Sequence, residues 1–273
     1  MLKENLENVR NKMPLIHNIT NYVTVNDCAN ILIACGGSPI MSDDVAEVEE
    51  ITTICGGLNI NIGTLNQATI PAMFLAGKKA NELRHSVILD PVGCGASKLR
   101  TETAFKLLDE IKFTVIRGNI SEIKTLAFGS GTTKGVDADV ADTIGCDTLE
   151  PTIQFAKKFS HKTGAIIAIT GEFDIVADAN QAYIIHNGHA MMSKVTGTGC
   201  MLTAMTAAYL AANLDSPLEA TVSSICALGL CGELAYNRLC KHDGNATYRN
   251  YIIDEIFHLN GNTLESGARY EVR

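Results

Sequence analysis

The feature that most constrains the fold is an alternation of short apolar runs with longer segments of helical spacing. The predicted strands are 57–62, 86–90, 113–116 and 165–169, all rich in Ile, Leu or Val. The predicted helices between them are 66–84, 101–111 and 151–161. This order and spacing are typical of a mostly parallel sheet that helices cover on both faces.

The pattern changes after residue 170. Segments 173–177 and 181–186 are short apolar runs separated by three small or polar residues, which predicts a β-hairpin and hence an antiparallel edge to the sheet. Segments 200–212 and 217–240 predict two helices rich in Ala, Leu and Cys. No stretch has the composition of a linker, so we expect one layered α/β domain spanning residues 1–273.

Composition limits the class of protein and its partners. Hydrophobic residues make up 46% of the 273 and charged residues 19%, which is enough for a sizeable core and excludes intrinsic disorder. The net charge of −8 argues against a duplex nucleic acid partner, because phosphate binding needs a positive surface. It does not argue against a nucleotide, which one local anion site can hold.

The cysteines and the apolar segments suggest a compartment. There are nine cysteines and no CxxC pair, so we expect reduced thiols and no disulfide framework. The N-terminus is charged and has no apolar signal segment, and residues 201–212 are too short to cross a bilayer. We therefore expect a cytoplasmic protein without a membrane partner.

Small, polar and charged residues follow four of the predicted strands. They are Gly63 after the first, Asp90 at the end of the second, the segment 117–122 after the third and Thr170 after the fourth. In an open parallel sheet, ligands bind outside the carboxyl ends of the strands. We therefore expect these four groups to meet at one rim.

The sharpest single motif is residues 195–200, Val-Thr-Gly-Thr-Gly-Cys, which opens a predicted helix. A turn containing Gly197, Thr198 and Gly199 lets backbone N–H groups approach an anion, and the helix dipole adds partial positive charge there. This favours an anion hole for a phosphoryl group. The alternative is an ordinary helix start in which Thr198 caps the first turn.

Asp90 and Glu122 are the carboxylates best placed to hold Mg²⁺, in part through water. The alternative for Glu122 is a first-turn helix acid favoured by the dipole. Arg117 could clamp a phosphate with both ends of its guanidinium, or simply pair with a neighbouring carboxylate. The glycine-rich segment 129–135 misses the dinucleotide-binding pattern and follows a helical stretch, so a loop is expected there.

Cys200 could also be a nucleophile, because a helix N-terminus lowers the pKa of a thiol. Thiol catalysis usually needs a nearby histidine base, and His186 and His189 are the nearest in sequence. These two histidines could instead suggest a metal pair. They leave a predicted strand without other ligands close by, so a structural role is favoured.

Taken together, the motifs resemble those of the hydroxyethylthiazole kinase family within the ribokinase-like superfamily. The resemblance covers nearly the whole chain, and the segments that carry it are 17–23, 37–41, 61–65, 89–93, 117–119, 168–172 and 194–200. Residues 119–122 also fit the superfamily's Asn-x-x-Glu element, which positions Mg²⁺ and phosphate. The resemblance implies a three-layer α/β/α fold.

The same resemblance implies an activity and residue roles. The family transfers phosphate from ATP, with Mg²⁺, to the hydroxyl of 4-methyl-5-(2-hydroxyethyl)thiazole in thiamine salvage. Arg117, Thr170 and Asn119 match its nucleotide side. Met41, Gly197 and the segment containing Asn21 match its thiazole side. It also implies a homotrimer with sites between subunits, in which a neighbouring chain could supply Asn21 and Met41.

One position departs from the wider superfamily, whose anion-hole motif normally ends in an Asp base. Here the residue is Cys200, whose thiol has an ordinary pKa of about 8.5 against about 3.9 for Asp. We expect Cys200 to orient the alcohol and to assist weakly as base without a covalent intermediate. A kinase for another small vitamin-precursor alcohol, a thiol hydrolase or acyltransferase, and a thiazole-binding regulator remain the alternatives.

Overall fold

The computed structural model describes residues 1–129, 133–134, 137–138 and 148–273. Its centre is a nine-stranded sheet in the order β11-β10-β9-β8-β5-β4-β3-β1-β2. Neighbouring strands from β2 to β8 run parallel, whereas β9, β10 and β11 each run antiparallel to the strand before them in that sheet. The parallel sheet and its antiparallel edge are as the sequence predicts.

The strands are short, and most of those in the sheet are buried. Their bounds are β1 Leu15–Ile19, β2 Ser38–Met41, β3 Gly57–Asn61, β4 Ser86–Asp90, β5 Val115–Asn119, β8 Ile166–Thr170, β9 Asp174–Ala177, β10 Ala182–Ile185 and β11 Tyr270–Val272. A separate small antiparallel pair is formed by β6 Thr133–Lys134 and β7 Asp137–Ala138. Strand β6 lies within the glycine-rich segment 129–135, where the sequence predicts a loop, and residues 130–132 and 135 of that segment lie outside the described residues.

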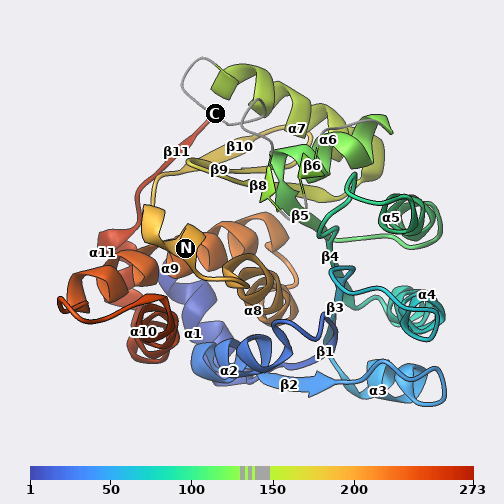
Figure 1. Ribbon diagram of the computed structural model, residues 1–273, viewed down its shortest axis with the longest axis horizontal. Coiled ribbons are helices and arrows are strands. Elements are labelled where there is room, and N and C mark those ends of the chain that lie inside the picture. Colours follow the sequence, from blue (N-terminus) through green and yellow to red (C-terminus); the bar gives the residue numbers. More distant parts are fainter. Residues whose placement is uncertain (130–132, 135–136, 139–147) are drawn as a thin grey trace.

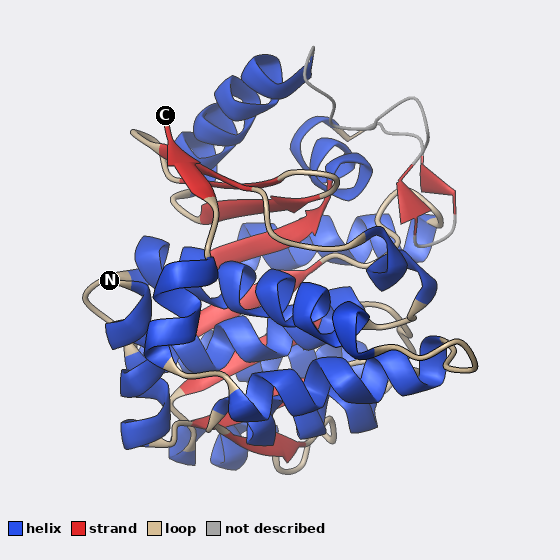
Figure 2. Cartoon of the chain, turned by 90° about the vertical axis from the view of Figure 1, so that its left-hand side faces the viewer, coloured by secondary structure: helices blue, strands red, loops and turns tan. Residues whose placement is uncertain are grey.

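Helices cover both faces of the sheet (Figure 1). One layer contains α3 Val48–Ile54, α4 Thr69–Glu82, α5 Lys98–Glu110, α6 Ile120–Phe128 and α7 Leu149–Thr163. The other contains α1 Leu2–Lys12, α2 Val25–Cys35, α8 Thr198–Ala212, α9 Pro217–Arg238, α10 Asn245–His258 and α11 Gly261–Gly267, with a 3₁₀ turn at Ala190–Lys194 before α8. Figure 2 looks onto this second layer, with the sheet behind it. The result is the expected α/β/α arrangement.

Two apolar clusters hold the layers together, one on each face of the sheet. We call them the α8 cluster and the α4 cluster, after a helix that contributes to each. Successive residues of β4 point to opposite faces, so Ile88 packs in the α8 cluster while Val87 and Leu89 pack in the α4 cluster. A strand buried on both faces reads as a continuous apolar run, which is why the sequence pattern for β4 is clear. Helix α8 is apolar on nearly all sides, because the sheet, α2 and α9 surround it.

Most predicted elements are confirmed within two to four residues, and several elements were not predicted. No element was predicted before residue 57, where the structure places α1, β1, α2, β2 and α3. Helix α10 was also not predicted, whereas α6 is the helical stretch expected before residue 129. The tail after residue 262, to which the sequence assigns nothing, completes α11 and adds β11 to the edge of the sheet.

The cysteines and the longest apolar helix give two further outcomes. Eight of the nine cysteines are described, and these eight are free thiols; Cys146 lies outside the described residues. Among the described residues, α9 is long and apolar enough to cross a membrane, but 83% of its apolar window is buried inside the protein. Helix α9 is therefore accounted for as a core helix.

Candidate functional site

The carboxyl ends of β3, β4, β5 and β8 meet the N-terminus of α8 at one rim of the sheet. In the strand registers Asn61 lies beside Asp90, and Asn119 lies beside Thr170. Helix α8 packs across β3 and β4, so its first turn comes down on the same rim. The structure thus brings together the groups that the sequence placed after separate strands.

Asp90 is the buried carboxylate of this rim. It is fully inaccessible to solvent, and its Oδ2 accepts hydrogen bonds from Asn61 Nδ2 at 2.9 Å and Thr203 Oγ1 at 2.8 Å. Its Oδ1 has no hydrogen-bond partner among the described residues. Burial raises the pKa of Asp90, and the Arg117 charge, Thr203 and Asn61 oppose that rise.

Arg117 links β5 to both of its neighbours at the rim. Its Nη2 donates to Thr170 Oγ1 at 2.5 Å, and its Nη1 lies 3.8 Å from Asp90 Oδ2. The guanidinium also lies against α8, because a Cβ added at Gly199 would be 2.5 Å from Nη1. Of the two alternatives for Arg117, the structure shows the pairing with a carboxylate, and it also places the guanidinium beside the first turn of α8.

Glu122 and Asn119 form a capping box at the start of α6. The Asn119 side chain accepts from Glu122 N at 2.9 Å, and Glu122 Oε2 accepts from Asn119 N at 2.8 Å. Glu122 Oε1 accepts from Gly93 N at 2.8 Å, which ties the loop after β4 to α6. Burial, followed by the Asp90 charge, raises the pKa of Glu122 to about 7. The helix-acid interpretation of Glu122 is confirmed.

The N-terminus of α8 carries no side-chain cap. Gly197 occupies the N-cap with φ of 91°, and the helix begins at Thr198. The interpretation of Thr198 as the capping residue is therefore wrong, because a left-handed glycine already occupies the cap position. A Cβ at Gly197 would lie 2.5 Å from Thr24 Cγ2, so only glycine fits there without displacement. The first N–H groups of α8 remain suited to an anion.

Cys200 lies in this first turn, and its sulfur faces amide donors. Asn21 Nδ2 and Asn61 Nδ2 each donate to Cys200 Sγ at 3.3 Å. Burial raises the pKa of the Cys200 thiol, and the Asp90 charge raises it further. Hydrogen bonds from Thr24 and Asn21 and the Arg117 charge act in the opposite direction.

The two candidate histidines lie elsewhere. The ring of His189 stacks on Tyr236 with centroids 3.5 Å apart, and His186 Nε2 lies 3.5 Å from Glu271 Oε1. None of the hydrogen bonds to Cys200 in the described part of the chain comes from a histidine. Across that same part, no three His, Cys, Asp or Glu side chains form a metal cluster. This arrangement disfavours a hydrolase or acyltransferase that uses the Cys200 thiol with a histidine base. The two histidines make structural contacts instead.

The two substrate-side residues occupy different positions. Asn21 is buried, and its Nδ2 donates to Cys200 Sγ and Asn61 Oδ1 of its own chain. Met41 ends β2 and is partly buried against the α8 cluster. The structure therefore assembles Asn21 with the rim and leaves Met41 at the adjoining edge strand.

Sequence reasoning missed three residues that touch the predicted ones: Asn61, Thr24 and Thr203. The signal for Asn61 was available, because it is a polar residue that ends an otherwise apolar strand. Thr24 is the residue just before α2 and Thr203 lies on α8, and only the tertiary fold shows that their hydroxyl groups face Cys200 and Asp90.

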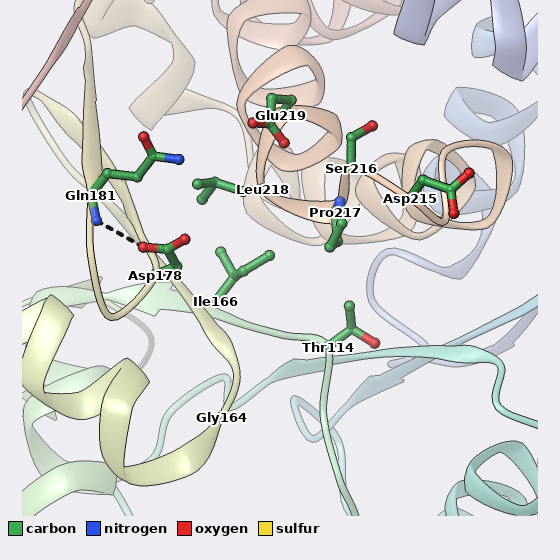
Figure 3. Close-up of a pocket in the computed structure, with 10 residues that line it drawn as sticks. All are labelled: Thr114, Gly164, Ile166, Asp178, Gln181, Asp215, Ser216, Pro217, Leu218 and Glu219. Atoms are coloured by element: carbon green, nitrogen blue, oxygen red, sulfur yellow. Dashed lines mark hydrogen bonds between the residues drawn. The ribbon is translucent and has the colours of Figure 1, made fainter.

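A cavity of about 360 Å³ lies at the opposite end of the sheet, between β8, the β9–β10 hairpin and the connection from α8 to α9 (Figure 3). Asp178, Asp215 and Glu219 are among its lining residues. Gln181 N donates to Asp178 Oδ1 at 2.8 Å. None of the predicted site residues lines this cavity.

Comparisons with known proteins place the chain in one family. The hydroxyethylthiazole kinase family profile matches residues 6–262. Hydroxyethylthiazole kinases from Clostridium acetobutylicum and Clostridium tetani are 71% and 49% identical, over 99% and 96% of this chain and 99% and 94% of theirs.

Solved structures agree with the sequence relatives. The hydroxyethylthiazole kinase protein of Pyrococcus horikoshii superposes with a TM-score of 0.88 at 32% identity, covering 100% of this chain and 98% of that one. The pyridoxal kinase of Staphylococcus aureus shares the fold alone, with a TM-score of 0.59 at 17% identity over 96% of this chain and 98% of that one. The chain belongs to the hydroxyethylthiazole kinase family.

Proposed function

We propose that the protein transfers the γ-phosphoryl group of ATP to the hydroxyl of 4-methyl-5-(2-hydroxyethyl)thiazole. The observation that carries this proposal is the uncapped N-terminus of α8, which has Cys200 in its first turn and Arg117 against it. Phosphoryl transfer needs positioning and charge stabilisation more than covalent chemistry. The rim offers both within one cluster of buried side chains.

Each group at the rim has a role in this reaction. The backbone N–H groups of the turn at Gly197, Thr198 and Gly199 hold the phosphoryl group as negative charge develops on it. Arg117 and Thr170, already hydrogen-bonded to each other, bind nucleotide phosphates, and Asn119 lies on the same side. Met41, Asn21 and Gly197 form the thiazole side.

The rim also fits a magnesium ion. Asp90 Oδ1 is a buried carboxylate oxygen without a partner among the described residues, and such an atom suits a cation or its bound water. Both oxygens of Glu122 already accept backbone N–H groups, so Glu122 fits contact through water better than direct ligation. When bound, the ion would neutralise charge on the ATP phosphates.

Cys200 orients the alcohol and assists as a weak base. Its sulfur accepts two amide hydrogen bonds, so it is held as an acceptor beside the α8 turn. A loose transition state makes little demand on base strength, so a covalent phosphocysteine is not part of the proposal.

The proposal includes a homotrimer whose sites lie next to subunit contacts. Tyr22 and Val23 follow Asn21 directly and are 79% and 57% exposed, and Ile33 of α2 is 58% exposed. Strand β2, which ends at Met41, is an edge of the sheet. Exposed apolar groups beside an open strand edge support association at this face. Sedimentation of Tyr22→Asp and wild-type protein tests this, since the variant should shift toward the monomer.

We place the reaction in the cytoplasm, which the eight free thiols support.

The experiment that tests the function measures ADP release from Mg·ATP with and without hydroxyethylthiazole, together with mass detection of the phosphorylated alcohol. The expected result is alcohol-dependent ADP matched by thiazole phosphate. If product forms only with another vitamin-precursor alcohol, the proposed substrate is wrong. If thiazole binds but is not phosphorylated, the proposed kinase activity is wrong.

A further inference from the structure

We propose that Asn61 is a positioning residue that holds the Cys200 sulfur and the Asp90 carboxylate in fixed relation through one side-chain amide. The proposal rests on the proposed kinase function. Asn61 ends β3, is 1% exposed, and lies between the two groups it joins. Nothing in the motifs themselves assigns it a role.

Backbone donors fix the orientation of the Asn61 amide. Its Oδ1 accepts from Gly63 N at 2.9 Å, and a backbone N–H can only donate. Its Nδ2 therefore points the other way, toward Asp90 Oδ2 at 2.9 Å and Cys200 Sγ at 3.3 Å. The orientation is the only one that satisfies both the amide donor of Gly63 and the carboxylate of Asp90.

The neighbouring amide is fixed by the same logic. Asn21 Oδ1 accepts from Thr24 N at 3.1 Å, so Asn21 Nδ2 faces Asn61 Oδ1 at 3.0 Å and Cys200 Sγ at 3.3 Å. All four hydrogen-bonding positions of the Asn61 amide are then used. Its Nδ2 donates to Asp90 and Cys200, and its Oδ1 accepts from Asn21 and Gly63. A saturated buried amide has one orientation, which transmits the position of Asp90 to Cys200.

The sulfur of Cys200 consequently meets two N–H donors and is held as an acceptor. The two fixed N–H donors favour the thiolate form of Cys200. A thiolate has a third lone pair, which can accept the alcohol proton while the other two face the amides. Asn61 does not reach the substrate in this account. It acts through Cys200 and Asp90.

Strand β3 offers a matched control. Asn59 lies two residues earlier on the same face and is also fully buried, and its Nδ2 donates to Asn18 Oδ1 at 3.0 Å. Asn59→Ala therefore removes a buried amide from the same strand without touching Cys200 or Asp90. Asn61→Asp is a second test variant, because it keeps the acceptor oxygen and the shape while replacing the donor.

The experiment compares Asn61→Ala, Asn61→Asp and Asn59→Ala with the wild type by kcat, KM and thiol titration. Both Asn61 variants should lower kcat by about 10- to 100-fold with KM changed by less than about 3-fold. Asn59→Ala should keep kcat within about 3-fold of the wild type. Equal kcat losses in Asn61→Ala and Asn59→Ala, or a wild-type kcat in Asn61→Asp, would overturn the proposal.

The titration readout follows the pH dependence of Cys200 alkylation by iodoacetamide, measured by mass spectrometry. The other groups acting on the Cys200 thiol are Asp90, Arg117, Cys28 and the hydrogen-bonding side chains of Thr24 and Asn21, and none of these residues is replaced in the variants. Losing the Asn61 donor should move the titration midpoint upward in both Asn61 variants and not in Asn59→Ala. An unmoved midpoint contradicts the proposal. Because alkylation needs no turnover, this arm stays decisive even if the thiazole kinase assay fails.

Discussion

The two ends of the parallel sheet differ in what they offer a ligand. The carboxyl-end rim gathers a carboxylate, a guanidinium, a thiol and a helix N-terminus, with their orientations set by hydrogen bonds. The cavity at the amino ends of the strands has a volume of about 360 Å³ and is lined mostly by small and acidic side chains (Figure 3). This contrast favours the carboxyl-end rim, where oriented chemical groups converge, as the proposed site, whereas the volume of an open pocket alone does not mark one.

The largest expected effect comes from Arg117→Ala. It removes the rim's link between Asp90 and Thr170 and the positive charge next to α8, so kcat/KM should fall by about 100- to 1,000-fold. Removing the Arg117 guanidinium leaves the Asp90 carboxylate buried without its positively charged neighbour, which should also destabilise the fold. Steady-state kinetics and urea unfolding measure both effects. Arg117→Lys is the control that keeps the charge, and near-wild-type kinetics for Arg117→Ala would place the chemistry elsewhere.

A smaller effect is expected from Gly199→Ala. The new Cβ would lie 2.5 Å from Arg117 Nη1, so the guanidinium must shift away from the α8 turn. We expect kcat to fall by about 10-fold while thermal stability holds, because Ala favours a helix more than Gly. Gly244→Ala is the control, since nothing lies within 4 Å of its Cβ position. A loss of stability without a loss of kcat would contradict this account.

Asp174→Asn tests whether the carboxyl of Asp174, next to the turn after β8, makes the free energy of unfolding depend on pH. Burial raises the pKa of Asp174 to about 6, opposed by the Gly171 N–H and the Arg117 charge. The folded protein therefore binds more protons than the unfolded chain between about pH 4 and pH 6, so stability should fall as the pH rises through that window.

Asp174→Asn removes the titrating carboxyl, so the free energy of unfolding should vary less with pH. We expect the change across the window to shrink by less than about 1 kcal/mol, because the side chain is partly exposed. Urea unfolding at pH 4.5 and pH 6.5, taken as roughly the two ends of that window, measures it. Asp178→Asn, just past the other end of the same strand, is the control. A steeper dependence in Asp174→Asn would show that the sign is wrong.

The smallest effect is expected in the amino-end cavity. Glu219 lines it and lies in the first turn of α9, so Glu219→Gln should cost only about 0.5 kcal/mol of stability through the helix dipole. The rate of alcohol-dependent ADP formation should stay within about 2-fold of the wild type. A large loss of activity would overturn the contrast between the two ends.

The sequence predicts the fold best where strands are apolar on both faces. Strand β4 and its neighbours show this pattern, and the predicted order of strands and helices there is confirmed. Strand β1 was missed because buried His17 and Asn18 interrupt its apolar run. Strand β11 is exposed at all three residues and forms by pairing with β10, which no local pattern reveals.

The site shows the same division between local and tertiary information. Asp90, Arg117, Thr170 and the α8 turn could be placed at one rim, because the carboxyl ends of parallel strands share an edge. The sequence could not show that a glycine rather than Thr198 occupies the cap of α8. It also could not show that Asn21 reaches Cys200 within its own chain, since 179 residues separate them.

The central claim is that the alcohol and the phosphoryl group meet at the α8 turn of the carboxyl-end rim. The most direct test follows alkylation of Cys200 by mass spectrometry in the presence of hydroxyethylthiazole and Mg·ATP, with exposed Cys240 as the internal reference. We predict that the ligands slow alkylation of Cys200 by more than about 10-fold and leave Cys240 unchanged. Unchanged alkylation of Cys200 at saturating ligand would contradict the account.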